Sequence, residues 1–142
     1  MVRALVDATV VIAFADSDDE HHERGTEIVR GIDRGELTTG IVTHEALVET
    51  LNFVNERSGA AKAETLLDSL EESTNFRLPY GPKSNVGQGR GLFRQHSGLS
   101  FGDAMQVAYM QAEGFEYIYS FDDDFDSVDG VTRLNRAENP FS

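Results

Sequence analysis

Cysteine and tryptophan are absent from this chain of 142 residues, and proline occurs only three times. The lack of cysteine excludes disulfide-stapled secreted modules, iron–sulfur proteins and cysteine-ligated zinc sites. Long apolar runs are missing too: none approaches the roughly 20 residues of a membrane-spanning helix, and the N-terminal segment runs into acids instead of a signal-peptide cleavage region. These absences lead us to expect a soluble protein of the cytoplasm.

Positive charge is scarce as well. Lysine and arginine together number 12 against 25 acids, so the formal net charge at pH 7 is −13, and only two of the 12 are lysines. Taken as an average, this charge argues against polyanionic partners such as nucleic acid, because the long-range field repels them. An acid excess with few lysines also suits a salt-rich cytoplasm, where counterions screen self-repulsion, so we expect a halophilic-type acidic surface.

The average conceals an acid-free window. Residues 73–102 contain no Asp or Glu, but they include Arg77, Lys83, Arg90 and Arg94. The window carries +4, and the other 112 residues therefore carry −17. Arginines interleaved with aromatic residues can hold phosphates and stack bases, although an ordinary connecting segment would look similar. The window is thus a candidate binding surface for an anionic substrate.

The order of expected elements indicates one domain, residues 1–142, of the α/β class. Short apolar runs predict strands at residues 3–6, 37–39, 76–78, 117–120 and 131–134. Helical spacing and capping residues predict helices at residues 9–15, 17–34, 43–57, 60–72 and 100–113. Strands that alternate with helices favour a short, mainly parallel central sheet flanked by helices. In such sheets, binding sites lie beyond the carboxyl ends of the strands.

Acidic residues follow two of these strands. Asp7 comes directly after the first strand, between two apolar runs, and Asp122, Asp123 and Asp124 come after the strand at 117–120. An Asp in a strand-to-helix turn often satisfies backbone donors only, but Asp7 is poorly placed for full solvation and should have a partner. For the three later acids, a solvated acidic loop competes with a ligand role.

Two acids on helices are further candidates. Asp103 lies at capping distance from Ser100, in a helix that is apolar nearly all round, where an unpaired charge costs roughly several kcal/mol. Asp103 can cap its helix, bind a metal or do both. Glu45 falls in the first turn of its helix and lines up with Glu49, so spacing alone favours a solvated helix face.

A cluster of such carboxylates would need a cation. Acids contributed by separate elements repel one another and raise each other's pKa in the empty protein, and a divalent ion relieves that repulsion. An all-oxygen ligand set selects Mg²⁺ or Mn²⁺ over zinc. The sequence thus predicts a Mg²⁺ or Mn²⁺ site wherever these acids meet.

Four segments in order resemble the acidic motifs of PIN-domain ribonucleases. They are LVDATVVIAFAD, THEALVE, LSFGDAMQVAYMQ and YIYSFDDDFDSVDGVTRL, and HERGTEIVRGIDRGELTTGIVTHEALVE resembles the family's second helix and strand. Length and order are similar to the VapC-type toxins of toxin–antitoxin pairs, so the resemblance covers nearly the whole chain. It implies an endoribonuclease that hydrolyses RNA phosphodiester bonds with a metal-activated water, a cognate antitoxin that blocks the site, and a homodimer.

The resemblance also implies roles for particular residues. The catalytic carboxylates and ligands of a Mg²⁺ or Mn²⁺ ion would be Asp7, Glu45, Asp103 and Asp122, with Thr9 as a supporting hydroxyl and Asp124 as an additional acid. Within the run 122–124, Asp123 and Asp124 are alternatives to Asp122 for the role of direct metal ligand. The candidate substrate-binding cations come from the charge pattern and not from the resemblance, and they are those of the acid-free window: Arg77, Lys83, Arg90 and Arg94.

The glycine-rich segment 87–94 departs from the family pattern. Family members more often have better helix formers there, whereas this chain has Gly87, Gly89 and Gly91. Each glycine costs a helix roughly 0.5–1 kcal/mol, so the sequence argues against a helix at this place.

The same residues also allow a protein of another class. A PIN-like binding module with weak catalysis would dock an arginine-bearing partner peptide in its acidic crevice. Such a module would gain little stability from Mn²⁺ and would cleave no RNA. The enzyme would be stabilised by Mn²⁺ and would cleave RNA.

Overall fold

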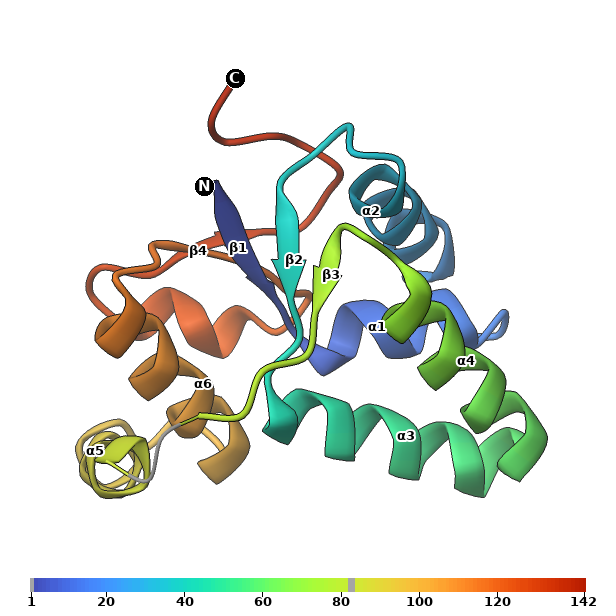
Figure 1. Cartoon of the computed structure of the whole chain (residues 1–142). Coiled ribbons are helices and arrows are strands. Elements are labelled where there is room, and N and C mark those ends of the chain that lie inside the picture. The colour runs from blue at the N-terminus through green and yellow to red at the C-terminus, as the bar shows by residue number, and fades with distance from the viewer. Residues whose placement is uncertain (1, 82–83) are drawn as a thin grey trace.

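The computed structural model describes residues 2–81 and 84–142, which form three layers, α/β/α (Figure 1). Five strands form the central sheet in the order β3-β2-β1-β4-β5, and each pair is parallel, which confirms the predicted α/β class. The strands are β1 (Arg3–Val6), β2 (Thr39–Ile41), β3 (Phe76–Arg77), β4 (Tyr117–Tyr119) and β5 (Thr132–Leu134). The helices are α1 (Ala8–Ala15), α2 (His22–Asp33), α3 (His44–Ser58), α4 (Ala60–Glu72), α5 (Ser84–Gln95) and α6 (Phe101–Glu113), with a short 3-10 helix, η1 (Asp123–Ser127).

Alternation along the strands divides the core between the two faces of the sheet. Leu5, Ile41 and Ile118 face one side, where they pack with α5 and α6. Ala4 and Val6 face the other side, in a cluster with α1, α2, α3 and α4. Because successive strand side chains point to opposite faces, a sheet covered by helices on both sides needs strands that are apolar throughout. This explains why the strands appear in the sequence as short continuous apolar runs.

Local signals bound the two helices that carry predicted acids. At the start of α3, Thr43 Oγ1 accepts a hydrogen bond from Ala46 N at 3.3 Å, as the sequence predicts. Gly114 ends α6 in the left-handed conformation, at a φ of 75°, which glycine adopts without strain. Capping by nearby residues therefore fixes where α3 begins, and with it the position of Glu45, and also fixes where α6, the helix of Asp103, ends.

Two predicted boundaries are wrong. The helix expected at 17–34 begins only at His22, because the residues before it form turns. In these turns Asp16 and Asp19 each accept, through Oδ1, the backbone N–H two residues further on, so they compete with helix formation. The strand β2 starts two residues later than expected, because the chain first completes the turn that follows α2.

Helix α5 corrects a third expectation, because the glycine-rich segment 87–94 is helical. Gly89 is buried against α6, where a Cβ would collide with Met105 Sδ and lie 3.4 Å from Met105 Cα. Close packing of two helices thus stabilises α5 despite its poor intrinsic propensity. The glycine marks a helix contact and not a loop.

The carboxyl ends of the parallel strands meet at one edge of the sheet. In Figure 1 this is the lower edge, where β1 leads into α1 and β2 leads into α3. The strand β4 leads into η1 at the same edge. Among residues 2–81 and 84–142, no helix has the length and apolar character needed to cross a membrane.

Candidate active site

Asp7 is the centre of a hydrogen-bond network at this edge, and it is only 1% exposed. Its Oδ2 accepts hydrogen bonds from Thr9 Oγ1 and Ser120 Oγ, both at 2.8 Å. Its Oδ1 accepts one from Gln106 Nε2, also at 2.8 Å. Three donors offset the cost of burying a carboxylate. Asp7 therefore has the partners that its apolar flanking sequence requires.

Two hydroxyl groups join β1 to the loop after β4. Ser120 Oγ accepts a hydrogen bond from Asp122 N at 2.9 Å, and Thr9 Oγ1 accepts one from Phe121 N at 3.1 Å. The two hydroxyl oxygens are 3.3 Å apart. Thr9, predicted as a supporting hydroxyl, thus contacts Asp7 and also orders the loop that carries Asp122.

Asp103 joins the cluster from the first turn of α6 and is 8% exposed. Its backbone N donates to Ser100 Oγ at 3.1 Å, so Ser100 is the residue that caps the helix. Burial, the charge of Asp7 and a carboxyl hydrogen bond to Asp122 raise the pKa of Asp103 to about 8. The surroundings of Asp103 therefore favour its protonated, uncharged form over the carboxylate.

Helix α3 places two acids beside this cluster, Glu45 and Glu49. Both line a cavity of about 220 Å³ together with residues of α6. Partial desolvation and the charges of Asp7 and Asp122 raise the pKa of Glu49. Spacing alone marks Glu49 as part of a solvated face, yet it is electrostatically coupled to the buried acids. Glu45, the predicted ligand, lies one turn earlier in the wall of the same cavity.

The three consecutive aspartates take different positions. Asp122 contacts Asp103, and its Oδ1 caps η1 by accepting a hydrogen bond from Asp124 N at 2.9 Å. Asp123 and Asp124 are exposed, and one oxygen from each of the three acids lies within 4.8 Å of the others. The charge of Asp122 raises the pKa of Asp124. Asp122, which is half-buried, therefore belongs with Asp103 to the carboxylate cluster, and Asp124 lies at its rim.

Asp126, the remaining acid of this loop, is paired elsewhere. Arg133 in β5 donates two hydrogen bonds to its carboxylate, each at 3.0 Å, and this contact lowers the pKa of Asp126. Arg133 also donates to Ser120 O at 3.3 Å. The two-pronged contact clamps η1 onto β5 and holds Ser120 in place beside Asp7.

Three residues of the site were not predicted from the sequence: Ser120, Gln106 and Glu49. Ser120 ends a strand and looks like an ordinary turn residue, although it is 0% exposed. Gln106 is 2% exposed and lies three residues after Asp103, on the same side of α6. A lone buried amide on an apolar helix needs a partner, and this is the signal that could have identified Gln106.

The predicted cations of the acid-free window lie outside the carboxylate cluster. Arg77 donates from Nη1 to two nearby backbone carbonyls, at 2.6 and 3.0 Å, which holds it against its own strand. Arg90 and Arg94 are exposed on α5. Lys83 lies outside the described residues. Among the cations of the window that the structure describes, Arg90 and Arg94 are thus the ones best presented to an anionic ligand.

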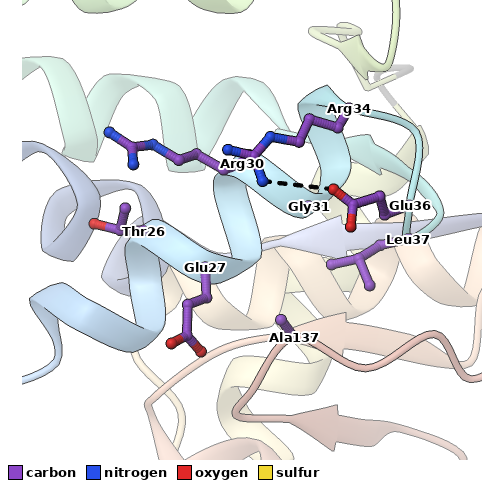
Figure 2. Close-up of a pocket in the computed structure, with 8 residues that line it drawn as sticks. All are labelled: Thr26, Glu27, Arg30, Gly31, Arg34, Glu36, Leu37 and Ala137. Carbon is purple, nitrogen blue, oxygen red and sulfur yellow. Dashed lines mark ion pairs between the residues drawn. The ribbon is translucent and has the colours of Figure 1, made fainter.

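A larger cavity, of about 470 Å³, lies away from these acids, between α2, the turn to β2 and the C-terminal tail (Figure 2). Its lining residues are Thr26, Glu27, Arg30, Gly31, Arg34, Glu36, Leu37 and Ala137. The ion pair between Arg34 and Glu36 spans 3.6 Å, and both side chains are more than 60% exposed, so it stabilises little. The formal charges of the two acids and two arginines in this lining cancel, and no predicted site residue takes part. Convergent buried polar groups, and not cavity size, locate the site.

Comparison with known families identifies the fold. The family model of the PIN domain matches residues 4–131. The chain belongs to the PIN domain family. The matched range includes Asp7, Asp103 and Asp122, the first three acidic segments and all but the last three residues of the fourth, so the family indicated by those segments is confirmed.

Solved structures from several organisms share this PIN fold. VapC20 from Mycobacterium tuberculosis, described as a sarcin–ricin loop cleaving toxin, has a TM-score of 0.75 at 22% identity, over 87% of this chain and 93% of its own. VapBC2 from Rickettsia felis, bound to a DNA fragment from its promoter, has a TM-score of 0.69 at 11% identity, over 95% and 99%. FitAcB from Neisseria gonorrhoeae has a TM-score of 0.64 at 16% identity, over 94% and 97%. Among curated proteins, no sequence matches.

The donor set of this PIN domain suits a hard divalent cation. Asp7, Asp103 and Asp122 offer only oxygen atoms, which Mg²⁺, Mn²⁺ and Ca²⁺ prefer to softer ligands. Burial first, and then the negative charges of Asp7 and Asp122, raise the pKa of Asp103, so an ionised carboxylate at this place is costly without a counter-charge. A bound cation would relieve this repulsion, so the residues present fit such an ion.

Proposed function

We propose that this PIN domain is a metal-dependent endoribonuclease of the VapC type. The observation that carries the proposal is the convergence of Asp7, Asp103 and Asp122, from three separate elements, at the edge where parallel sheets bind ligands. Buried acids that repel one another are suited to a ligand and not to stabilising the fold. Similarity to VapC20, a toxin described as cleaving the sarcin–ricin loop, supports RNA as the substrate class.

Mg²⁺ or Mn²⁺ would be held by the three acids that converge at this edge, with further carboxylates at the rim. The set comprises Asp7, Asp103 and Asp122, with Glu45, Glu49 and Asp124 around them. When bound, the ion would supply a water of lowered pKa for in-line attack on a phosphodiester and would stabilise the leaving oxygen. An all-oxygen set favours Mg²⁺ or Mn²⁺ over zinc.

The chain's own polar groups prepare Asp7 for this role. Thr9, Ser120 and Gln106 donate to both of its oxygens, which orients the carboxylate before any ligand arrives. Asp103 has to release its proton when a cation binds, because proton and cation compete for the same oxygens. Metal affinity should therefore increase as the pH rises towards the pKa of Asp103.

RNA and protein partners follow from the same proposal. Arg90 and Arg94 on α5 would hold RNA phosphates that the rest of the acidic surface repels, with Lys83 and Arg77 as further cations of the window. A cognate antitoxin protein would block the crevice, and the structural likeness to a toxin–antitoxin complex from Klebsiella pneumoniae supports such a partner. We also expect a homodimer, and an RNA-cleaving toxin would act in the cytoplasm.

The decisive experiment is RNA cleavage with Mn²⁺, with Mg²⁺ and with EDTA. Total RNA incubated with the purified protein should be cut at defined positions when either metal is present and should stay intact in EDTA. Asp103→Asn should be inactive in all three conditions while keeping the circular dichroism spectrum of the wild type. Cleavage that persists in EDTA, or in Asp103→Asn, would contradict the proposed site.

A second candidate function is a binding module with weak catalysis. The cavity of about 220 Å³ has Glu45, Glu49 and Asp103 in its wall, which complements the guanidinium of an arginine-bearing peptide. A Mn²⁺ titration separates the two functions. An enzyme should gain thermal stability with Mn²⁺ and cleave RNA, whereas a docking module should do neither.

A further inference from the structure

A second cavity, lined by aromatic rings, lies beside the carboxylate cluster. It has a volume of about 400 Å³, within the range of small-ligand pockets. Its lining residues are Thr9, Ile12, Asp19, Glu20, His21, Phe53 and Phe121. The rings of His21 and Phe121 are stacked, with centroids 4.5 Å apart and planes inclined by 21°. Phe53 is 37% exposed, so a large apolar ring faces solvent at this point.

Hydrogen bonds connect this aromatic pocket to Asp7. Thr9 is part of the pocket wall, and its Oγ1 donates to Asp7 Oδ2 at 2.8 Å. The same oxygen accepts from the backbone N of Phe121 at 3.1 Å. On α3, Phe53 follows Glu49 by four residues, so both lie on one face of the helix, about 6 Å apart along its axis. A chain bound with a phosphate at the acids therefore has a neighbouring unit within reach of the pocket.

The charges around the pocket exclude a phosphate but suit a base. Asp19 and Glu20 are in its wall, and within residues 2–81 and 84–142 its lining includes no lysine or arginine. Carboxylates repel phosphate, whereas they accept hydrogen bonds from the amino and imino groups of nucleobases. Aromatic side chains that stack bases, with acceptors at the rim, are typical of single-stranded RNA recognition.

We propose that this aromatic pocket binds one nucleobase next to the scissile phosphate, with stacking on Phe53, His21 and Phe121. The proposal rests on the proposed ribonuclease function and adds to it a determinant of cleavage position. Asp19 and Glu20 accept hydrogen bonds from the exocyclic amino group of the base. The pocket therefore favours guanine, adenine or cytosine over uracil, which has no amino group and whose imino N–H is flanked by two carbonyl oxygens that the carboxylates repel.

The first part of the test is cleavage of an RNA pool of random sequence in Mn²⁺, with sequencing of the product ends. Wild type should disfavour uracil at one position adjacent to the cut. Phe53→Ala and His21→Ala should lose this bias, whereas Phe53→Tyr, which keeps the ring, should retain it. Phe141→Ala is the matched control, because Phe141 is 44% exposed and packs on Tyr117, outside the pocket.

The second part measures binding without cleavage, in EDTA. A labelled oligoadenylate is compared with the same sugar–phosphate backbone lacking its bases. Removing the bases should weaken binding by roughly 10-fold in wild type and in Phe141→Ala, and by much less in Phe53→Ala. Oligouridylate should bind more weakly than oligoadenylate to the wild type.

The two parts fail in different ways. In one outcome, the wild type cleaves RNA, but Phe53→Ala and His21→Ala keep both the bias against uracil and the dependence of binding on the bases. This outcome overturns the proposal of a base pocket and leaves the proposed nuclease function standing. Absence of metal-dependent cleavage overturns the proposed function, and the binding comparison then decides the pocket by itself. If the same variants lose only the binding of a partner protein, the pocket is a protein docking site and the proposal is wrong.

Discussion

The carboxylate cluster and the acid-free window hold charge in opposite ways. In the cluster, Asp7 and Asp103 are 1% and 8% exposed, and their neighbours come from elements far apart in the chain. In the window, Arg90 and Arg94 are exposed on a single helix. Water and salt screen the second pair, but they hardly screen the first.

This difference determines how much each region can do. A buried acid alters its neighbours' pKa values and has to be matched by a proton, a hydrogen bond or a cation, so its removal changes chemistry outright. An exposed cation adds a modest attraction that falls with ionic strength. We therefore expect large effects at the cluster, intermediate effects at its rim and small effects in the window.

The largest expected effect is the loss of Asp103. Asp103→Asn keeps size and helix position but removes a ligand charge, so kcat/KM for RNA cleavage should fall by about 1,000-fold or more. Asp7→Asn should be equally inactive but also less stable than the wild type. One end of the asparagine amide is an NH₂ donor, and it would face side-chain donors that hydrogen-bond to the Asp7 carboxylate in the wild type. Asp68→Asn, an exposed acid on α4, is the control and should keep full activity.

Next in size is the contrast between the two acids of α3. Glu49→Gln should lower kcat/KM by about 30-fold, because Glu49 is coupled to Asp7 and Asp122. Glu45→Gln, one turn away in the same cavity wall, should have a smaller effect. Steady-state cleavage of one RNA by both variants gives the comparison. A larger loss in Glu45→Gln would move the functional acid back to the residue implied by the family resemblance.

The third effect is on stability and depends on pH. The pKa of Asp103 rises from 3.8 to about 8 on folding, so its contribution to stability is fully present below about pH 4 and is lost as the pH rises to about 8. In EDTA, the Tm of wild type should therefore fall between pH 5 and pH 8 by about 5 °C more than that of Asp103→Asn. Mn²⁺ at pH 8 should restore the wild type only. Parallel Tm curves for the two proteins would show that Asp103 is not the strained acid.

The smallest expected effect is at the window. Arg90→Gln and Arg94→Gln should each raise KM for RNA by about 3-fold, leave kcat unchanged and reduce the salt dependence of binding by about 0.7 in log–log slope. Arg77→Gln should matter less, because its guanidinium is already bonded to backbone carbonyls. Lys62→Gln, an exposed cation on α4, is the control. Equal effects at Lys62 and Arg90 would show that only net charge matters.

Much of the fold could be predicted, because its signals are local. The apolar run before Asp7, the Thr43 cap and the Gly114 stop depend on a few neighbouring residues, and each predicts its element within about one residue. The errors arise where tertiary contacts override local preference. The glycines of α5 disfavour a helix, yet Gly89 allows α5 to pack closely against Met105.

The candidate site was predictable to a smaller extent. Acids at strand ends predict a carboxylate cluster because parallel strands share one carboxyl edge. Sequence spacing does not distinguish Glu45 from Glu49, or Asp122 from its two neighbours, since each set belongs to one short segment. In the folded chain, the charge of Asp7 acts on Glu49, and Asp122 is the aspartate of its run that interacts with Asp103.

By itself, the sequence determined the class of fold, the excess of acids and the identity of the groups available for chemistry. Apolar periodicity and acids at strand ends depend on neighbouring residues, so they can be identified without knowing the fold. Only the tertiary structure decided which acids are buried together, that Ser120 and Gln106 support Asp7, and that an aromatic pocket adjoins the site. The physical reason is that desolvation and charge coupling depend on distance in space, which the folded sheet sets among residues far apart in the chain.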